Sequence, residues 1–261
     1  MNRRDWTRSE LLLAFDLYCR LPFGRLHKSN PEVVKLAQLV ERTPSAVAMK
    51  LVNYASFDPE LKKRGIKGLS NVGRGEREIW DQFSHDPDQL AVECRTLAVG
   101  AQSVDEQRTA KELSSDAESE HIDQPTVTEA LRLTKVRLVQ AFFRNAVLSS
   151  YEYRCSMCDL AVPQLLTASH IIPWSKTEHR RADPRNGLSL CALHDRAFDR
   201  GLLTVDEEKR VMISSQMPTS TSCDLQRVAF AEITGKRLTL PHRFFPDESA
   251  LAYHRANVFV A

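Results

Sequence analysis

Two short motifs of cysteine and histidine constrain the C-terminal half of this chain more than any other feature. Cys155 and Cys158 are separated by two residues, and Cys191 and His194 repeat that spacing, beginning 33 positions after Cys158. Such pairs can each lie on a tight turn and together close a tetrahedral zinc site. The alternative is three ordinary buried thiols. Six cysteines in 261 residues, three of them clustered with a histidine, do not indicate the disulfide framework of a small secreted protein.

Further polar residues with chemical potential lie between and beside these motifs. A short apolar strand is interrupted by one histidine, His170, and an Asn-Gly turn follows at Asn186. The next segment has the pattern of a helix that presents His194, Asp195 and Asp199. Because the two aspartates are four positions apart, their carboxylates lie on one helix face. A histidine alone on such a strand would most often be a core residue, but the combination indicates a site.

This combination resembles the HNH endonucleases, whose ββα-metal motif places a general-base histidine on a strand opposite a metal-binding helix. The resemblance covers residues 150–205, where the runs ASHIIPW and NGLSLCALHDRAFDRGLLTVD are similar to the HNH domains of bacterial restriction-type nucleases. The C-terminal run LPHRFFPDESALAYHRANVF is similar to the end of such proteins. The resemblance implies metal-dependent hydrolysis of phosphodiester bonds, with 5′-phosphate and 3′-hydroxyl products.

The resemblance also implies catalytic roles for three residues. His170 matches the first histidine of the family motif, the base that takes a proton from the attacking water. Asn186 matches the middle asparagine, which orders the loop and holds the histidine strand. Asp195 is expected to hold a catalytic divalent cation, because a hard oxygen ligand suits Mg²⁺ or Mn²⁺.

The last position of the motif allows two alignments. In the first, His194 completes a structural zinc site and Asp195 holds the catalytic ion. In the second, His194 is itself the catalytic ligand, and the cysteines are left without a fourth partner. Ser169 stands where many members of the family have a carboxylate or histidine ligand, so the second ligand of the catalytic ion is open; Asp199 is a substitute.

The first block, residues 1–84, has the pattern of a helical domain. A capping box begins one helix at Thr7, and Asn-Pro and Thr-Pro pairs begin two more at Asn30 and Thr43. The short turn between the latter two is typical of a helix-turn-helix, whose second helix could enter a major groove; a structural or dimerising role is the alternative. The candidate DNA-contacting residues here are Lys50, Asn53, Lys62, Lys63, Arg64 and Lys67.

Charge divides the chain into three parts. Residues 1–84 carry 15 Lys/Arg against 10 Asp/Glu, residues 85–130 carry 3 against 11, and residues 131–261 carry 18 against 13. Two basic blocks around an acidic stretch suggest two polyanion-binding modules. We predict an acidic flexible linker over 85–125 and an HNH nuclease domain with a C-terminal extension over 126–261. The candidate phosphate contacts around the HNH motif are Arg180, Arg181, Arg185, Arg196 and Arg200.

The sequence thus predicts an α+β protein with a helical, helix-turn-helix-like domain, a linker and a ββα-metal nuclease domain. The predicted function is cleavage of double-stranded DNA in restriction or phage defence, with modified DNA as a plausible target. A zinc-stabilised nucleic-acid-binding protein without turnover and a non-specific, toxin-like nuclease are the alternatives. A homodimer would explain double-strand cutting, since each HNH site cuts one strand. No apolar run approaches the length of a membrane span and no secretory signal is visible, so we expect a cytoplasmic protein.

Overall fold

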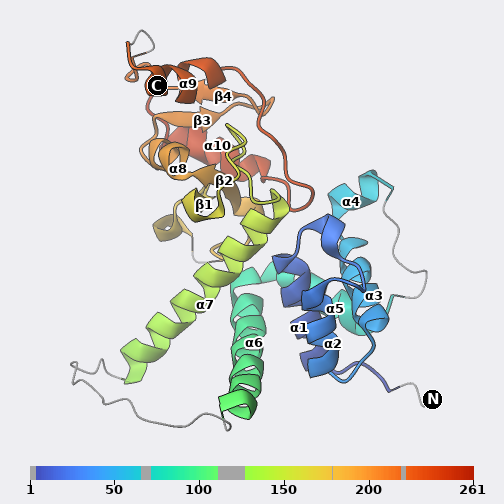
Figure 1. The fold of residues 1–261 in the computed structure, drawn as a ribbon. Coiled ribbons are helices and arrows are strands. Elements are labelled where there is room, and N and C mark those ends of the chain that lie inside the picture. The colour runs from blue at the N-terminus through green and yellow to red at the C-terminus, as the bar shows by residue number, and fades with distance from the viewer. Residues whose placement is uncertain (1–3, 66–71, 111–126, 178, 219–221) are drawn as a thin grey trace.

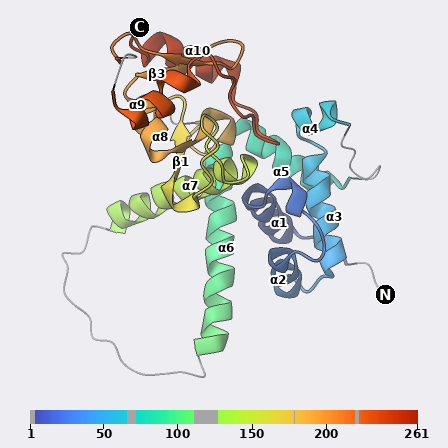
Figure 2. The same cartoon turned by 45° about the horizontal axis from the view of Figure 1, so that its top comes forward.

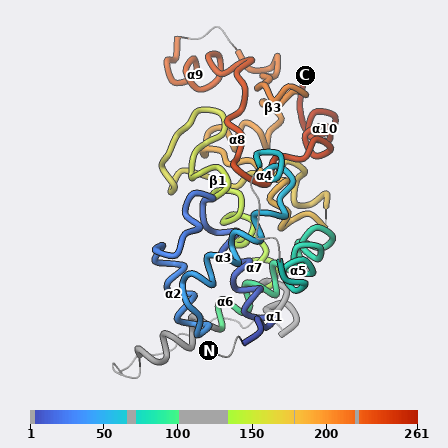
Figure 3. Tube along the Cα trace, turned by 90° about the vertical axis from the view of Figure 1, so that its right-hand side faces the viewer, coloured from blue at the N-terminus to red at the C-terminus, as the bar shows by residue number. Residues whose placement is uncertain are grey.

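The computed structural model describes residues 4–65, 72–110, 127–177, 179–218 and 222–261. Helices make up the N-terminal half, and two small antiparallel sheets lie in the C-terminal half (Figure 1), in agreement with the predicted mixed fold. The tube in Figure 3 places these two parts at opposite ends of the molecule. Lys67, one of the predicted DNA contacts, lies outside the described residues. No helix in the described ranges is long and apolar enough to cross a membrane.

The N-terminal helices begin where their capping residues predict. The backbone N–H of Thr7 donates to Glu10 Oε2 and the N–H of Glu10 donates to Thr7 Oγ1, which completes the predicted capping box. Asn30 and Thr43 cap the next two helices through their side chains. The apolar faces enclose one core, centred on Phe15. The bounds are α1 (Arg8–Arg20), α2 (Pro31–Leu39), α3 (Pro44–Ala55), α4 (Pro59–Lys63) and α5 (Arg74–His85).

The predicted linker is wrong over its first part. Helix α6 runs from Pro87 to Ala110, and Leu90, Ala91 and Cys94 are fully buried against α1 and the later helix α7 (Val127–Ser150). These apolar residues recur at helical spacing and form one buried face of the helix. The linker prediction rests on the acidic composition of the whole stretch, and an average over the stretch does not reveal such a face. The rest of the predicted linker, from residue 111, lies outside the described residues up to residue 126.

Helix α7 (Val127–Ser150) connects the two halves of the molecule (Figures 1 and 2). Val139 and Phe142 belong to the core of the N-terminal helices. Phe143 and Val147, on another face of the same helix, belong to the core around the sheets. A single rigid helix therefore contributes side chains to both cores, and the relative position of the halves depends on its packing.

The first sheet pairs β1 (Leu166–His170) with β2 (Gly187–Cys191) in antiparallel register, with Leu166 opposite Cys191 and His170 opposite Gly187. Helix α8 (Ala192–Asp199) follows β2 directly and packs on both strands. The second sheet pairs β3 (Leu203–Val205) with β4 (Val211–Ile213). The remaining elements are α9 (Asp224–Ala229), α10 (Glu248–Asn257) and short 3-10 helices at Phe23–Arg25, Pro163–Leu165, Trp174–Lys176, Pro184–Asn186 and Ala231–Ile233.

A buried arginine joins the C-terminal segment to the end of α1. The Arg243 guanidinium donates to the backbone carbonyls of Tyr18, Cys19 and Leu21, and also to Ser149 Oγ on α7. Its side chain has no solvent exposure and lies over the Tyr18 ring. The last carbonyls of a helix lack partners within the helix and carry partial negative charge, so a cation satisfies them well.

We expect Arg243→Met to lower the free energy of unfolding by about 3 kcal/mol, because three buried carbonyls lose their donor and each unsatisfied group costs roughly 1 kcal/mol or more. Urea denaturation followed by circular dichroism measures this. Arg237→Met, a change at an exposed arginine, is the matched control and should stay within about 0.5 kcal/mol of the unaltered protein. Equal effects of the two changes would contradict the assigned role of Arg243.

Candidate active site and zinc site

The four residues of the two spaced motifs converge. Strand β2 ends at Cys191, α8 carries His194, and the loop after α7 supplies Cys155 and Cys158. Their ligand atoms all lie within 4.8 Å of one another. Individual separations are 3.4 Å from Cys155 Sγ to His194 Nδ1, 3.3 Å from Cys191 Sγ to His194 Nδ1 and 4.0 Å between the sulfurs of Cys158 and Cys191. These separations approach the roughly 3.5–3.8 Å expected between neighbouring ligand atoms of a tetrahedral zinc site. The cluster could hold a zinc ion.

The second ring nitrogen of His194 decides how this residue is used. His194 Nε2 lies 2.8 Å from the carbonyl oxygen of Ala229, which can only accept a hydrogen bond. Nε2 therefore carries a proton, and Nδ1 faces the sulfurs of Cys155 and Cys191. A zinc-binding histidine is oriented by a backbone carbonyl in this way. The geometry favours the alignment in which His194 belongs to the zinc site, and both ring nitrogens are thereby occupied.

The protonation of the cysteines is also compatible with metal binding. Hydrogen bonds from Cys155 and then Cys158 lower the pKa of Cys191, whereas hydrogen bonding to Cys155 and Cys191 raises the pKa of Cys158. Shared hydrogen bonds therefore stabilise one thiolate within the cluster. Thiolates are the form that binds zinc, and a bound ion would lower the pKa of the remaining thiols.

His170 ends β1 in an enclosed position. Its Nε2 lies 2.9 Å from the carbonyl oxygen of Arg181, so Nε2 donates and the lone pair resides on Nδ1. The imidazole stacks on the Phe143 ring at 3.7 Å between centroids, and the edge of Trp174 lies against it. Burial lowers the pKa of His170 below its ordinary value of 6.5. The result is a neutral, oriented imidazole with one nitrogen available to accept a proton.

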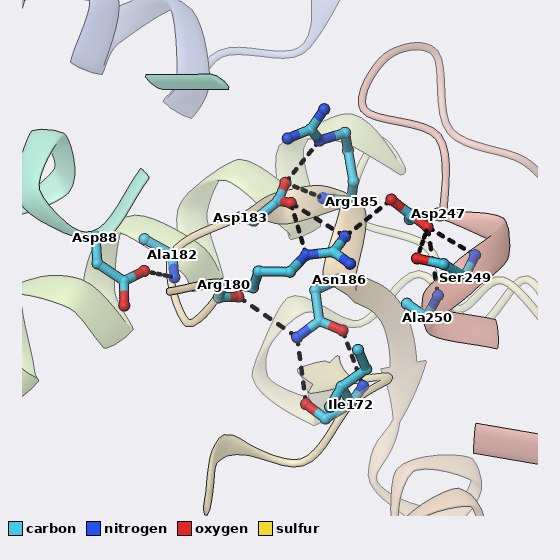
Figure 4. Close-up of polar contacts among 10 residues, drawn as sticks. All are labelled: Asp88, Ile172, Arg180, Ala182, Asp183, Arg185, Asn186, Asp247, Ser249 and Ala250. Carbon is cyan, nitrogen blue, oxygen red and sulfur yellow. Dashed lines mark hydrogen bonds and ion pairs between the residues drawn. The ribbon is translucent and has the colours of Figure 1, made fainter. Parts of the chain in front are cut away.

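Asn186 ties the His170 strand to the loop that follows it (Figure 4). Its Oδ1 accepts from the N–H of Ile172 at 2.8 Å, and its Nδ2 donates to the carbonyls of Ile172 at 3.2 Å and Arg180 at 3.4 Å. The N–H of Ile171 donates to the Asn186 carbonyl. With no solvent exposure, Asn186 makes the contacts that a loop-ordering asparagine requires.

Asp195 and Asp199 lie one turn apart on α8, and Asp195 approaches β1. Burial raises the pKa of Asp195, and the side chains of Ser169 and Thr167 on β1 lower it. Burial also raises the pKa of Asp199, and the charge of Asp195 adds to that effect. Across the described ranges, the Cys155 cluster is the one group of three or more His, Cys, Asp or Glu side chains with ligand atoms within 4.8 Å. The two aspartates therefore have no third protein ligand of that kind.

This donor set nevertheless fits Mg²⁺ or Mn²⁺. A hard cation of this type is commonly held by one or two carboxylates and completes its shell with water and substrate phosphates. Asp195 and Asp199 could supply such oxygen donors.

The basic residues near His170 differ in their surroundings. Arg180 pairs with Asp183 and Asp247, and Arg185 pairs with Asp183 at 2.9 Å (Figure 4). The guanidinium of Arg181 lies 4.8 Å from the Trp174 ring centroid and its Nε donates to the Trp174 carbonyl. Three of the predicted phosphate contacts are thus held by the protein itself. The other two, Arg196 and Arg200, are exposed at α8.

The predicted DNA-reading residues of α3 are engaged inside the helical domain. Asn53 is buried and donates to Glu76 Oε1 at 3.0 Å, and Lys50 Nζ lies 2.5 Å from the same oxygen. Burial opposes ionisation of Glu76, but the hydrogen bonds from Lys50 and Asn53 hold its pKa below the ordinary value. In this structure Asn53 cannot reach DNA, because the buried carboxylate of Glu76 needs both partners. The pattern of α3 alone does not reveal a partner on α5.

The remaining predicted contacts of this half lie at α4. Lys62, Lys63 and Arg64 are exposed. Lys63 pairs with Glu60, and Arg64 donates to the carbonyl of His242. Surface ion pairs of this kind are weak, so Lys62 and Lys63 stay available to phosphates.

The comparisons with known proteins bear on the segment just described. A family model described as HNH endonuclease matches residues 155–206. Residues 155–206 form an HNH endonuclease domain. No curated protein matches it.

One solved structure with similarity to the chain is described as a modification dependent TagI restriction endonuclease. It has a TM-score of 0.34 and 21% sequence identity, and the match covers 45% of this chain and 38% of that chain. The match thus spans less than half of that chain.

Proposed function

We propose that this protein is a metal-dependent DNA endonuclease in which His170 is the general base. The observation that carries the proposal is the hydrogen bond from His170 Nε2 to the Arg181 carbonyl within an HNH domain. It leaves Nδ1 as the acceptor for a proton from the attacking water. Burial keeps the imidazole neutral at neutral pH, which is the state that a base needs.

The other residues of the HNH domain support this base in distinct ways. We propose that β1, β2 and α8 form the ββα-metal unit, in which Asn186 holds the loop beside His170. Asp195, with Asp199, would hold Mg²⁺ or Mn²⁺. When bound, such an ion polarises a phosphate oxygen and neutralises the charge that develops on the leaving oxygen. The Cys155–Cys158–Cys191–His194 cluster would hold a structural zinc ion that fixes α8 against β2.

Arg196 and Arg200 extend this site towards DNA. Both are exposed on or just after the helix that carries the aspartates, so they can pair with phosphates on either side of the cleaved bond. Two copies of the chain would be needed to cut both strands at once, since each HNH site hydrolyses one phosphodiester. We therefore propose duplex DNA as the substrate and a homodimer as the form that makes double-strand breaks, in a restriction or phage-defence role.

The test is digestion of matched unmodified, methylated and hydroxymethylated duplexes with Mg²⁺, Mn²⁺ or EDTA. We expect cleavage with either metal and none with EDTA, and the preferred duplex identifies the modification that directs the enzyme. Binding to DNA without cleavage under every metal condition would instead favour a zinc-stabilised nucleic-acid-binding protein. Cleavage of all duplexes at equal rates would favour a non-specific nuclease.

The burial of His170 predicts the pH dependence of the reaction. A lowered pKa means that the imidazole stays unprotonated to a lower pH than an exposed histidine does. We expect kcat/KM to be level through neutral pH and to fall about tenfold per pH unit only below about 6.5. Initial rates measured from pH 5 to 8, with DNA affinity followed over the same range, provide the check. An acid limb centred above pH 6.5 would show that another group is the base.

A further inference from the structure

The carbonyl that orients His170 belongs to a peptide group that is held from its other side as well. The carbonyl oxygen of Arg181 lies 2.9 Å from His170 Nε2. The N–H of the same peptide bond, that of Ala182, donates to Asp88 Oδ1 at 2.6 Å. Figure 4 shows Asp88 reaching Ala182 from a helix outside the HNH domain. A carboxylate, one peptide group and the imidazole are thus connected by two hydrogen bonds in series.

We propose that Asp88 is a positioning residue for the general base His170 and acts through the Arg181–Ala182 peptide. This inference rests on the proposed function of His170. A short hydrogen bond to a carboxylate is charge-assisted, and it draws electron density towards the carbonyl of the same peptide. The carbonyl then accepts more strongly from His170 Nε2, which holds the ring orientation and favours the tautomer with the lone pair on Nδ1.

The position of Asp88 in the fold holds its carboxylate in place. It lies in the first turn of α6, and Leu90, Ala91 and Cys94 anchor that helix in the core of the N-terminal helices. Asp86 begins the helix by accepting from the N–H of Gln89. The carboxylate of Asp88, from the helical half of the chain, therefore contacts the loop beside His170. Its partner Ala182 lies 94 positions further along the sequence.

Other charged groups surround this carboxylate. A cavity of about 350 Å³ lies between α6, α7 and the loop, and its lining includes Asp86, Lys135, His179 and Arg181. Burial raises the pKa of Asp88, the Ala182 N–H lowers it, Asp86 raises it, and Arg181 and His179 lower it. The hydrogen bond and the two basic side chains therefore oppose the loss of charge that burial alone would favour.

The experiment compares Asp88→Ala, Asp88→Asn and the control Asp86→Asn in the full chain. Asp86→Asn removes the same charge from the same cavity and keeps a helix-capping side chain, but it does not touch the loop. We expect Asp88→Ala to lower the single-turnover cleavage rate by about 10- to 100-fold, and Asp88→Asn by less, because asparagine keeps an acceptor oxygen without the charge. DNA affinity should change less than twofold in all three, and Asp86→Asn should cut like the unaltered protein.

A second readout separates this inference from the proposed function. In ¹⁵N-labelled protein, the imidazole shifts of His170, assigned by their loss in His170→Gln, should report the Nε2–H tautomer and a mixed population in Asp88→Ala. This measurement needs neither cleavage nor DNA. Absence of cleavage by the unaltered protein would overturn the proposed function. The tautomer of His170 would in that case still test whether Asp88 positions the imidazole. Unchanged imidazole shifts and unchanged rates in a folded Asp88→Ala protein would overturn the role of Asp88.

Discussion

Replacing His170 with alanine is expected to lower DNA cleavage by at least about 10²- to 10⁴-fold, because the attacking water loses its proton acceptor. DNA affinity should stay nearly unchanged, since most binding energy comes from Lys and Arg contacts to phosphates. The imidazole is half-buried, with Phe143 against its face and Trp174 against its edge, so it offers little surface for contact with DNA. Single-turnover cleavage with Mg²⁺, and fluorescence anisotropy of labelled duplex in EDTA, measure the two quantities separately.

The matched variant is Asp195→Ala, which should also be inactive but for another reason. The cation loses a carboxylate anchor, so excess Mn²⁺ should partly restore cleavage. The same excess should leave His170→Ala inactive, because the missing function is proton acceptance. Near-normal cleavage by His170→Ala would disprove its role. If His194→Ala were folded, zinc-loaded and inactive while Asp195→Ala cut normally, His194 would be the catalytic ligand.

Replacing Cys155 with serine is expected to remove zinc and to lower the free energy of unfolding of the C-terminal half by several kcal/mol. Zinc binding supplies roughly 10–16 kcal/mol to small zinc domains, and we expect a loss on the order of a third of that. The cluster joins the loop after α7, β2 and α8 through one set of side chains. Metal analysis after dialysis into Mg²⁺ buffer should find about one zinc per unaltered chain and far less in the variant. Urea denaturation gives the loss of stability.

Cys223→Ser is the control for this change, because Cys223 is an exposed cysteine outside the cluster. It should keep both zinc and stability. Well-folded unaltered protein without zinc would exclude the metal site and would reopen the alignment in which His194 holds the catalytic ion. Loss of cleavage with full stability in Cys155→Ser would point to a direct catalytic role for the cluster.

Local sequence determined much of this protein. Capping residues and apolar spacing located the first helices, because the groups that satisfy a helix start lie within a few residues of it. The C-x2-C and C-x2-H spacings identified four side chains that converge in the structure, since ligands on tight turns need little else to be brought together. His170 and Asn186 were also identified from the sequence, because both belong to the short HNH motif.

Phe143, Trp174 and Asp88 were missed as neighbours of the base. Trp174 could have been noticed, because it lies four residues after His170 in the same run. Phe143 belongs to a helical stripe that has the appearance of ordinary core. Asp88 follows an Asp-Pro helix start, a pattern that predicts where α6 begins but not which loop its carboxylate meets.

Only the tertiary structure decided which polar side chains are free for function. Lys50 and Asn53 have the composition of DNA contacts, yet Glu76 on another helix occupies both. Arg243 could have been a surface charge, but it is buried at the end of a helix more than two hundred positions away. Segment 87–110 belongs to a stretch of acidic composition, but Leu90, Ala91 and Cys94 are buried in a core. Burial and pairing depend on residues distant in sequence, so spacing rules that act over a few residues cannot report them.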